Sequence, residues 1–227
     1  MAPTAAERPL SEIIRERRAT PSFDSSPVPE EDLKKILQAG LEAPSGYNLQ
    51  PWRFVVVRDP AQRKRLREAA MGQSKVEEAP VVIVACGDPG GWRDDLEPVL
   101  QLGAEHGFND PKRIEQTRQV ISGFRGSPAG NAGGVGPDWN VWINRHVMIA
   151  FTTVMWMAEA LGYDTAPMEG FFEDKVREVL GIPPLVRVVA LLAIGRRKGA
   201  DKPHGGRFPV ARLCFDNAWN RPLKIGK

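Results

Sequence analysis

The chain has 227 residues, of which 42% are hydrophobic and 26% are charged, so it can bury one sizeable core and one domain is expected. Its formal net charge is +3 with both signs mixed along the chain, which argues against a nucleic-acid partner. Cys86 and Cys214 both stand in apolar runs and predict buried thiols in a reducing compartment. The start has no apolar leader and no run is long enough to cross a bilayer, so we expect a cytoplasmic protein without a membrane partner.

Periodic apolar residues divide the chain into helices and strands. Helical spacing predicts helices over residues 10–18, 30–42, 60–70 and 139–161, a short helix ending at Leu180, and a weakly helical stretch over 94–124 that is broken near 107–111. Short apolar runs predict strands at 54–57, 81–86 and 186–194, and 210–215 is compatible with a last strand. The stretch 139–161 is apolar on most sides, which is typical of a central buried helix.

Two stretches predict surface segments. Residues 126–137 hold five glycines and cannot pack, so we expect a mobile loop of the kind that covers sites. The tail from 216 onward carries Trp219 and Leu223 without a regular pattern. Large apolar residues in such a tail are expected to dock on another surface, and a second subunit is one candidate.

The most informative stretch lies between the helix over 30–42 and the strand at 54–57. Pro44 and Pro51 bracket it, so neither regular element can pass through. Between them stand Ser45, Asn48 and Gln50, whose side chains donate and accept hydrogen bonds without charge. Such groups suit the polar edge of a flat heterocycle better than a metal or a phosphate. An ordinary polar turn is the alternative, and this stretch alone does not decide between them.

Other site chemistries find little support. The three histidines are spread along the chain, and no metal-binding, paired-cysteine or serine-nucleophile motif is present in the sequence. Gly87 to Gly91 follow a strand, but their spacing and Pro89 do not fit a dinucleotide-binding loop. We expect Arg145 and His146 to be structural. If the protein is an enzyme, a bound cofactor carries the difficult chemistry.

Four segments together resemble the nitroreductase family of flavin enzymes. They are Arg17-Arg18-Ala19-Thr20-Pro21-Ser22-Phe23, the stretch from Pro44 to Trp52, the stretch from Leu161 to Phe171 followed by Leu180-Gly181-Ile182-Pro183, and Arg207 before the last predicted strand. The segments recur in family order and spacing across nearly the whole chain. The resemblance implies an α+β fold with a central, mostly antiparallel sheet flanked by helices, a long buried helix and a variable lid-like segment at about 94–138. It also implies a homodimer with an exchanged C-terminal segment and FMN at the subunit interface.

The resemblance implies a role for each matching residue. Arg17 and Arg207 would hold the phosphate and ribityl end, with Arg18 and the Ala19 backbone beside them. The ring would be lined by the partner's copies of Pro44, Ser45, Gly46 and Asn48, with Gln50 in the same loop, and along its other edge by Pro167, Met168, Glu169 and Gly170. There the backbone N–H of Glu169 would point at flavin N5 and that of Gly170 at O4. For the arginines, a helix end that favours positive charge is an alternative, and for Glu169 a surface acid at a helix start.

Two positions depart from the family pattern. The family's cation near the pyrimidine edge of the flavin falls on Pro21, and its serine falls on Ala19. Gln73 or Lys75 is a candidate to replace the missing contact. If neither supplies it, the flavin would be harder to reduce, which leaves the reaction open but not the cofactor.

The resemblance implies an FMN-dependent oxidoreductase that takes hydride from NADH or NADPH and reduces a nitroaromatic, a quinone or a similar small-molecule acceptor in a ping-pong cycle. One alternative keeps the flavin and changes the reaction to reductive dehalogenation, an oxidase reaction or flavin breakdown. Pro21 and the long 94–138 segment motivate it, with Phe108, Phe124, Trp139 and Trp142 as candidate lid aromatics that could equally be ordinary packing residues. The other alternative is a non-catalytic flavin-binding protein.

Overall fold

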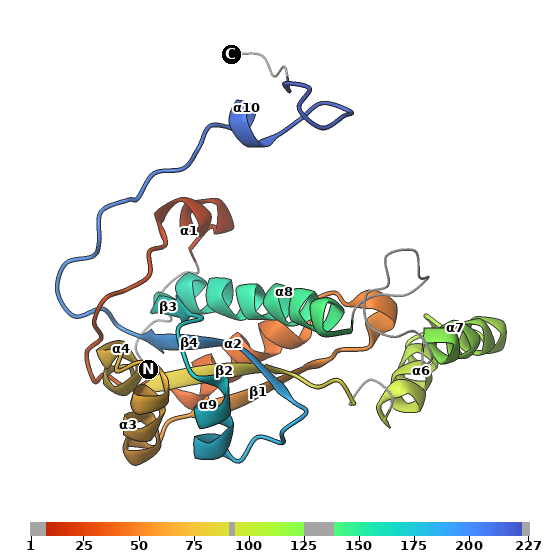
Figure 1. The fold of residues 1–227 in the computed structure, drawn as a ribbon, viewed down its shortest axis with the longest axis horizontal. Helices are drawn as coiled ribbons and strands as arrows, with labels where there is room; N and C mark the ends of the chain where they lie inside the picture. The colour runs from red at the N-terminus through yellow and green to blue at the C-terminus, as the bar shows by residue number, and fades with distance from the viewer. Residues whose placement is uncertain (1–7, 91–93, 125–138, 224–227) are drawn as a thin grey trace.

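The computed structural model describes residues 8–90, 94–124 and 139–223 (Figure 1). The predicted loop at 126–137 therefore lies outside the described residues. Its centre is a four-stranded antiparallel sheet in the order β1 (Trp52–Val57), β2 (Val81–Gly87), β4 (Arg187–Gly195), β3 (Asp164–Met168). The fold is thus α+β with an antiparallel sheet, as the sequence predicts.

Helices cover both faces of the sheet. One face carries α8 (Trp139–Ala160) and α2 (Glu30–Leu41), and the other carries α3 (Pro60–Ala69), α4 (Ser74–Glu78) and α9 (Glu173–Leu180), as Figure 1 shows for α8, α3 and α9. Alternate residues of β2 point into the two cores, so the whole strand is buried and reads as a continuous apolar run. Within the described residues, no helix combines the length and the apolar character that a membrane span requires.

Close packing joins α2 to α8. A Cβ added at Gly40 would lie 2.4 Å from Cγ2 of Val154, so only glycine permits this approach of the two helices. The opposite side of α8 is not covered in the single chain, where Val141 and Ile149 are each 42% exposed. The prediction of a helix buried on most sides therefore holds only for the side that faces the sheet and α2.

The N-terminal segment crosses the C-terminal end of α8. The short helix α1 (Leu10–Glu16) follows Arg8, whose N–H donates to the carbonyl of Ala160 at 3.1 Å. The chain then runs beside β3, where Ala19 forms a parallel bridge with Thr165 and the Thr20 N–H donates to the Thr165 carbonyl at 2.9 Å. These contacts place the first predicted arginine segment along the edge of the sheet.

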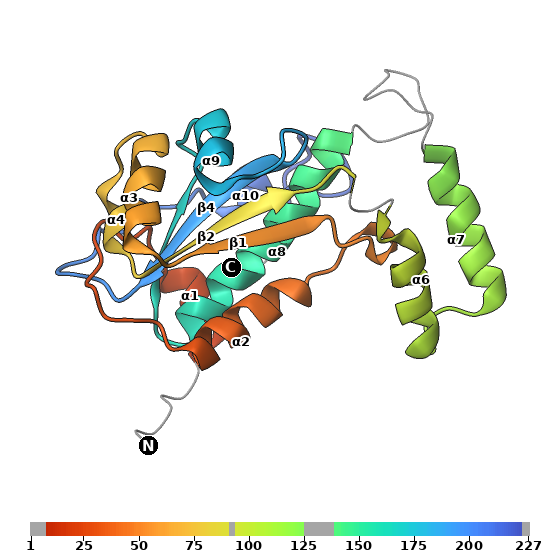
Figure 2. The ribbon, with the colours of Figure 1, turned by 90° about the horizontal axis from the view of Figure 1, so that it is seen from below.

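Helices α6 (Leu96–Glu105) and α7 (Pro111–Phe124) stand beyond one end of the sheet (Figure 2). The predicted break near 107–111 separates them. They share a small apolar cluster with the polar loop, because Leu49 packs with Leu96, Leu100 and Ile121.

The C-terminal arm, residues 199–223, leaves the body after Lys198, whose N–H donates to the Ser22 carbonyl at 3.0 Å (Figure 1). Its segment 210–215 is not a strand: the short helix α10 (Val210–Leu213) lies there instead, away from any sheet edge that could pair with it. Phe208 is 58% and Trp219 82% exposed. Cys214 is exposed as well, so the prediction of a buried thiol is wrong for this residue and correct for Cys86.

Strand β3 and helix α4 were not predicted from the sequence. Strand β3 contains Pro167, which cannot donate to a ladder, and the sequence shows no alternation there. It forms because it lies at the edge of the sheet, where its main chain pairs with β4 on one side and meets only the short bridge from Ala19 to Thr165 on the other. The segment with Gly170 therefore follows a strand, β3, that the sequence pattern does not predict.

Candidate functional site

The polar loop between α2 and β1 has a strained backbone. Tyr47, Asn48 and Gln50 have φ angles of 54°, 57° and 45°, which makes three of the six non-glycine residues with positive φ in the described chain. Each such residue costs of order 1–3 kcal/mol, less for asparagine, and is kept only where the surroundings fix it. Here the Ser45 Oγ accepts from the Gln50 N–H at 3.0 Å. A strained, over-determined loop motivates a functional hypothesis for this stretch.

His146 fixes the loop from α8. Its Nε2 lies 3.0 Å from the Gly46 backbone N, which must donate, so Nε2 accepts through its lone pair. Its Nδ1 lies 2.7 Å from the Trp142 carbonyl oxygen, which can only accept, so Nδ1 carries the proton. The ring is therefore neutral in this arrangement. His146 therefore has a structural role: it holds the loop at Gly46, which lies 100 residues before it in the sequence.

The two adjacent arginines after α1 do different things. Arg18 Nη1 donates to the carbonyls of Arg15, Glu16 and Arg17 at 3.0, 2.7 and 2.9 Å, so it closes the C-terminal end of the helix. Arg17 Nη1 is buried and has no hydrogen-bond partner in the described residues. An unpartnered buried guanidinium nitrogen is costly unless an anion meets it. The helix-end interpretation therefore fits Arg18, and Arg17 retains a donor for a ligand.

A buried polar pair stands behind Arg17. Thr165 Oγ1 donates to Oε1 of Glu159, in the last turn of α8, at 2.7 Å, and Glu159 is only 4% exposed. The pKa of Glu159 is raised to about 7, chiefly by burial and in part by Asp164, whereas the Thr165 hydrogen bond and the charges of Arg17 and Arg8 oppose the shift. Since Thr165 also accepts from Thr20, this pair ties α8 to the arginine segment. Sequence analysis missed both residues; for Thr165 the reason is that β3 itself was not predicted.

Beyond the other end of β3 lie Glu169 and Gly170. Gln73 Nε2 donates to the Gly170 carbonyl at 2.8 Å and to the Ala70 carbonyl at 3.2 Å. Across the described chain, neither the Glu169 nor the Gly170 backbone N–H donates to a protein acceptor. The structure thus places Gln73 in contact with Gly170, the last residue of the predicted segment Pro167-Met168-Glu169-Gly170. For Lys75, the other candidate at this edge, burial lowers the pKa and the nearby charge of Lys202 lowers it further.

The predicted site residues form separate groups in one chain. Arg17 to Ala19 and Pro167 to Gly170 lie along β3, whereas the loop from Pro44 to Gln50 is attached to His146 near the opposite end of α8. Fourteen helical steps from His146 to Ala160 correspond to about 21 Å. Arg207 lies on the C-terminal arm, where its Nη1 donates only to the neighbouring Gly206 carbonyl at 2.6 Å. A single chain does not assemble all of these residues around one ligand.

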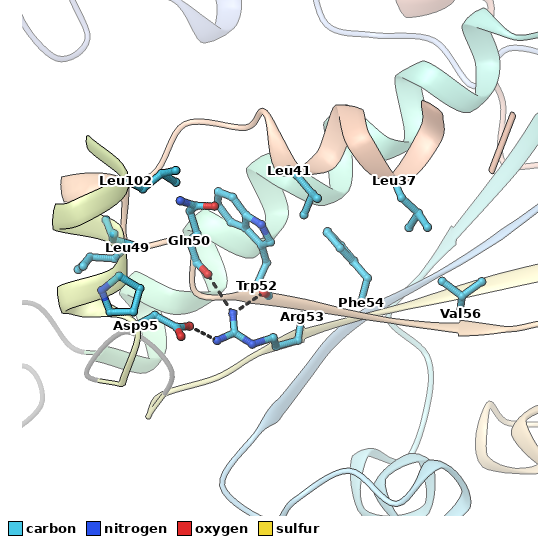
Figure 3. Close-up of a pocket in the computed structure, with 12 residues that line it drawn as sticks. Leu37, Leu41, Leu49, Gln50, Trp52, Arg53, Phe54, Val56, Asp95 and Leu102 are labelled. Carbon is cyan, nitrogen blue, oxygen red and sulfur yellow. Dashed lines mark hydrogen bonds and ion pairs between the residues drawn. The ribbon is translucent and has the colours of Figure 1, made fainter. Parts of the chain in front are cut away.

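Two cavities flank the polar loop. One, of about 500 Å³, lies between the loop and the α6–α7 pair and is lined by Pro44, Ser45, Tyr47, Asn48, Val99, Leu100, Gly103, Phe108, Asn109, Arg113 and Thr117. The other, of about 520 Å³, lies between α2, β1 and α6 (Figure 3). Gln50 lines the second cavity rather than the first, and its carbonyl accepts from Arg53 Nη1 at 3.2 Å. Gln50 therefore lines a different cavity from Ser45 and Asn48, although its Nε2 donates to the Asn48 carbonyl at 3.3 Å.

The candidate lid aromatics have different surroundings. Phe108 lines the cavity beside the loop, and the Trp142 ring lies 4.0 Å from the His146 ring between centroids. The side chains of Phe124 and Trp139 lie outside the described side chains. In the part of the chain that the structure describes, no three His, Cys, Asp or Glu residues gather as metal ligands would.

The chain is similar in sequence and in fold to known proteins. A family model described as the nitroreductase family matches residues 14–196. A Thermus thermophilus protein named NADH dehydrogenase is 38% identical over 202 residues, covering 88% of this chain and 91% of its own length. Protein DrgA of Synechocystis is 30% identical over 217 residues, covering 92% and 96% respectively. A protein from Exiguobacterium sibiricum solved in complex with FMN has 27% identity and a TM-score of 0.81, with 93% of this chain and 98% of that chain covered.

Proposed function

Because the chain belongs to the nitroreductase family, we propose that it is an FMN-dependent oxidoreductase that uses NADH or NADPH to reduce a small-molecule acceptor such as a nitroaromatic or a quinone. The observation that carries the proposal is the arrangement along β3. The Nη1 atom of Arg17, which has no hydrogen-bond partner in the described residues, lies beside one end of the strand. The backbone N–H groups of Glu169 and Gly170, which donate to no protein acceptor in the described chain, lie beyond the other end. Thr165 and Glu169 are about 13 Å apart along an extended chain.

This arrangement fits an elongated ligand with an anion at one end and a flat polar group at the other. Arg17 would bind the phosphate of FMN through its free guanidinium nitrogen, since guanidinium donates well to phosphate oxygens. Arg18 would act indirectly, by ending α1 so that the Ala19 backbone lies at the strand. Arg207 would complete the anionic end once the C-terminal arm is folded against a partner.

The other end of β3 would hold the reactive edge of the ring. FMN, when bound, supplies hydride transfer in a ping-pong cycle, first with NADH or NADPH and then with the acceptor. The Glu169 and Gly170 amides would donate to N5 and O4, and the fixed main chain means that no reorganisation is needed during reaction. Gln73 would set the position of Gly170 through its 2.8 Å hydrogen bond to that residue's carbonyl. Pro167 and Met168 would lie along the same edge.

We propose that the remaining wall comes from a second copy of the chain. The loop with Pro44, Ser45, Gly46 and Asn48 is attached at His146, about 21 Å along α8 from Ala160, where the segment that carries Arg17 begins, so the loop and the anionic end lie apart in one chain. The uncovered apolar side of α8 and the exposed apolar residues of the arm are two surfaces that a homodimer would bury. Exchange of the arm between subunits would follow from its separation from its own body.

A second candidate keeps FMN but changes the reaction to reductive dehalogenation, an oxidase reaction or flavin breakdown. It is favoured by one observation, namely that the side chain which reaches Gly170 is the neutral carboxamide of Gln73 and not a cation. A neutral group stabilises the reduced, anionic ring less than a cation would. Slow turnover of NAD(P)H with a simple quinone would favour this candidate, and brisk turnover would favour the first.

The decisive experiment is a visible spectrum of the purified protein, with and without added FMN, followed by anaerobic titration with NADH and with NADPH. We expect a yellow protein that loses its visible absorbance with one equivalent of nicotinamide per FMN and regains it when a quinone is added. A colourless protein that stays free of FMN after incubation contradicts the proposal. Tight FMN binding without reduction by either nicotinamide would indicate a non-catalytic flavin-binding protein instead.

A further inference from the structure

The cavity between the polar loop and the α6–α7 pair is suited to a flat molecule. Its volume is about 500 Å³, which is in the range of sites for small ligands. Tyr47 and Phe108 line it from opposite elements, and both are about half exposed although they are large aromatic residues. Exposed rings on the walls of a cavity offer stacking surface to an aromatic or quinoid ligand. The loop that forms one wall is the one proposed above to lie against the flavin.

The positive charge of Arg113 indicates which class of ligand the cavity would bind. Among the described lining residues, Arg113 is the only charged one, and the polar side chains around it are uncharged. No ion pair joins the Arg113 guanidinium to a carboxylate in the described chain. Its carbon Cζ lies 4.2 Å from the centroid of the Phe108 ring, so a cation–π contact holds it at the wall. The arginine is thus fixed in place and retains its charge for a ligand.

Two other arginines of this region are paired with carboxylates, unlike Arg113. Arg118, one helical turn further along α7, bonds Glu97 and Glu115 at 2.8 and 2.6 Å, and Arg53 pairs with Asp95. Of the two acids close to Arg113 in sequence, Glu115 bonds Arg118, and Asp110 caps α7 by accepting from the Arg113 backbone N–H at 2.7 Å. Arg113 also stands in the first turn of a 14-residue helix, where the helix dipole adds positive potential.

We propose that this cavity binds the electron acceptor and that Arg113 makes the enzyme prefer flat acceptors that carry an anionic group, such as a carboxylate, over neutral ones of the same shape. The inference rests on the proposed function, since it assigns the acceptor side of that reaction. Arg113 is a specificity residue here and takes no part in hydride transfer. A carboxylate placed against a partly exposed guanidinium gains up to about 1 kcal/mol, which corresponds to a roughly fivefold preference.

The test compares 4-nitrobenzoate with 4-nitrobenzamide, which differ in charge but hardly in shape. Steady-state kcat/KM for both is measured with the FMN-loaded wild-type protein, Arg113→Gln and Lys112→Gln. Lys112 is the matched control, because it is an exposed cation next to Arg113 that does not line the cavity. We expect Arg113→Gln to lower kcat/KM for the benzoate about fivefold through KM while the benzamide value stays the same, and Lys112→Gln to change neither.

Three results would overturn the inference. Equal losses for both acceptors would mean that Arg113 is structural, unchanged values would mean that it does not meet the acceptor, and equal effects of Lys112→Gln would mean general electrostatic attraction. Raising the salt concentration should reduce the benzoate preference of the wild type and leave that of Arg113→Gln unchanged. If the protein is not reduced by either nicotinamide, the proposed function fails, and equilibrium dialysis of the two compounds still tests the preference on the purified protein.

Discussion

The two sides of the proposed site are built in opposite ways. The β3 side is formed by main chain that lies on the sheet, with Thr165 and Glu159 buried behind it and Arg17 beside it. The loop side is formed by a strained turn that His146 connects to α8 through a hydrogen bond. The β3 side is therefore held in place by the core of its own subunit. The loop side is held by contacts near the loop itself, and its polar residues remain accessible to a second copy. This difference is what a site shared between two copies requires, and each experiment below acts on one side of it.

The largest effect is expected from the buried acid behind the β3 side. Below about pH 4.5 Glu159 is protonated in both the folded and the unfolded protein. Between pH 4.5 and about 7 the folded protein keeps a proton that the unfolded chain loses, so the free energy of unfolding falls as pH rises. Above pH 7 this free energy stops falling, because Glu159 is ionised in both states. The total is about 3 kcal/mol. Glu159→Gln has no proton to lose, so it should gain that amount relative to wild type between pH 4.5 and 8. Urea unfolding at fixed protein concentration measures this.

Glu68→Gln, on the exposed face of α3, is the control for the loss of a carboxylate. Its unfolding free energy should follow that of the wild type at every pH. Parallel curves for Glu159→Gln and wild type would mean that the buried carboxyl does not titrate in this range.

The next effect concerns ligand affinity on the same side. Arg17→Met removes the unpartnered guanidinium nitrogen and should weaken FMN binding by about 2 kcal/mol, or roughly 30-fold, because charged hydrogen bonds are worth about 1.5–3 kcal/mol. Arg18→Met is the matched variant, since it removes the helix end contacts and should lower stability with a much smaller change in affinity. Fluorescence titration of the apoprotein with FMN separates the two. Similar losses in both variants would refute the division of roles between the arginines.

A smaller effect is expected on the loop side. His146→Ala removes the acceptor of the Gly46 N–H and the donor to the Trp142 carbonyl, so the loop should lose about 1 kcal/mol of local support. Faster hydrogen exchange should be confined to residues 44–50, with β3 unaffected. If protection on β3 falls by the same factor, the two sides are coupled and the contrast drawn above is incorrect. Thr153→Ala on the same helix provides a control for a general loosening of α8.

The last prediction concerns thiol reactivity, where no change in stability is involved. Burial raises the pKa of Cys86 to about 12, so this thiol should stay unreactive in the native protein. Cys214 is exposed on the arm and should react, but more slowly as protein concentration rises if a second copy covers the arm. Labelling with a chromogenic disulfide at several concentrations measures this. A rate independent of concentration, in a range where the protein changes from monomer to dimer, would place the arm outside the interface.

Much of the fold follows from local sequence. The strands at 81–86 and 186–194 and the helix at 139–161 were predictable, because their apolar runs and periodicity reflect burial against a core. Strand β3 was not, since a proline-containing edge strand depends on its neighbour for hydrogen bonds and shows no alternation. The segment 210–215 was misread as a strand because a short apolar run also suits one turn of helix, and no sheet edge lies beside it.

The sequence by itself determined which residues are candidates, because the order and spacing of the four segments are properties of the chain. Only the tertiary structure decided which of two neighbouring arginines keeps a free donor, that Gln73 reaches Gly170, and that His146 holds a glycine 100 residues away. Those outcomes depend on contacts between segments far apart in the chain. The local sequence pattern indicates whether a residue is buried, but not which group it contacts. Contacts between distant segments therefore cannot be predicted from it.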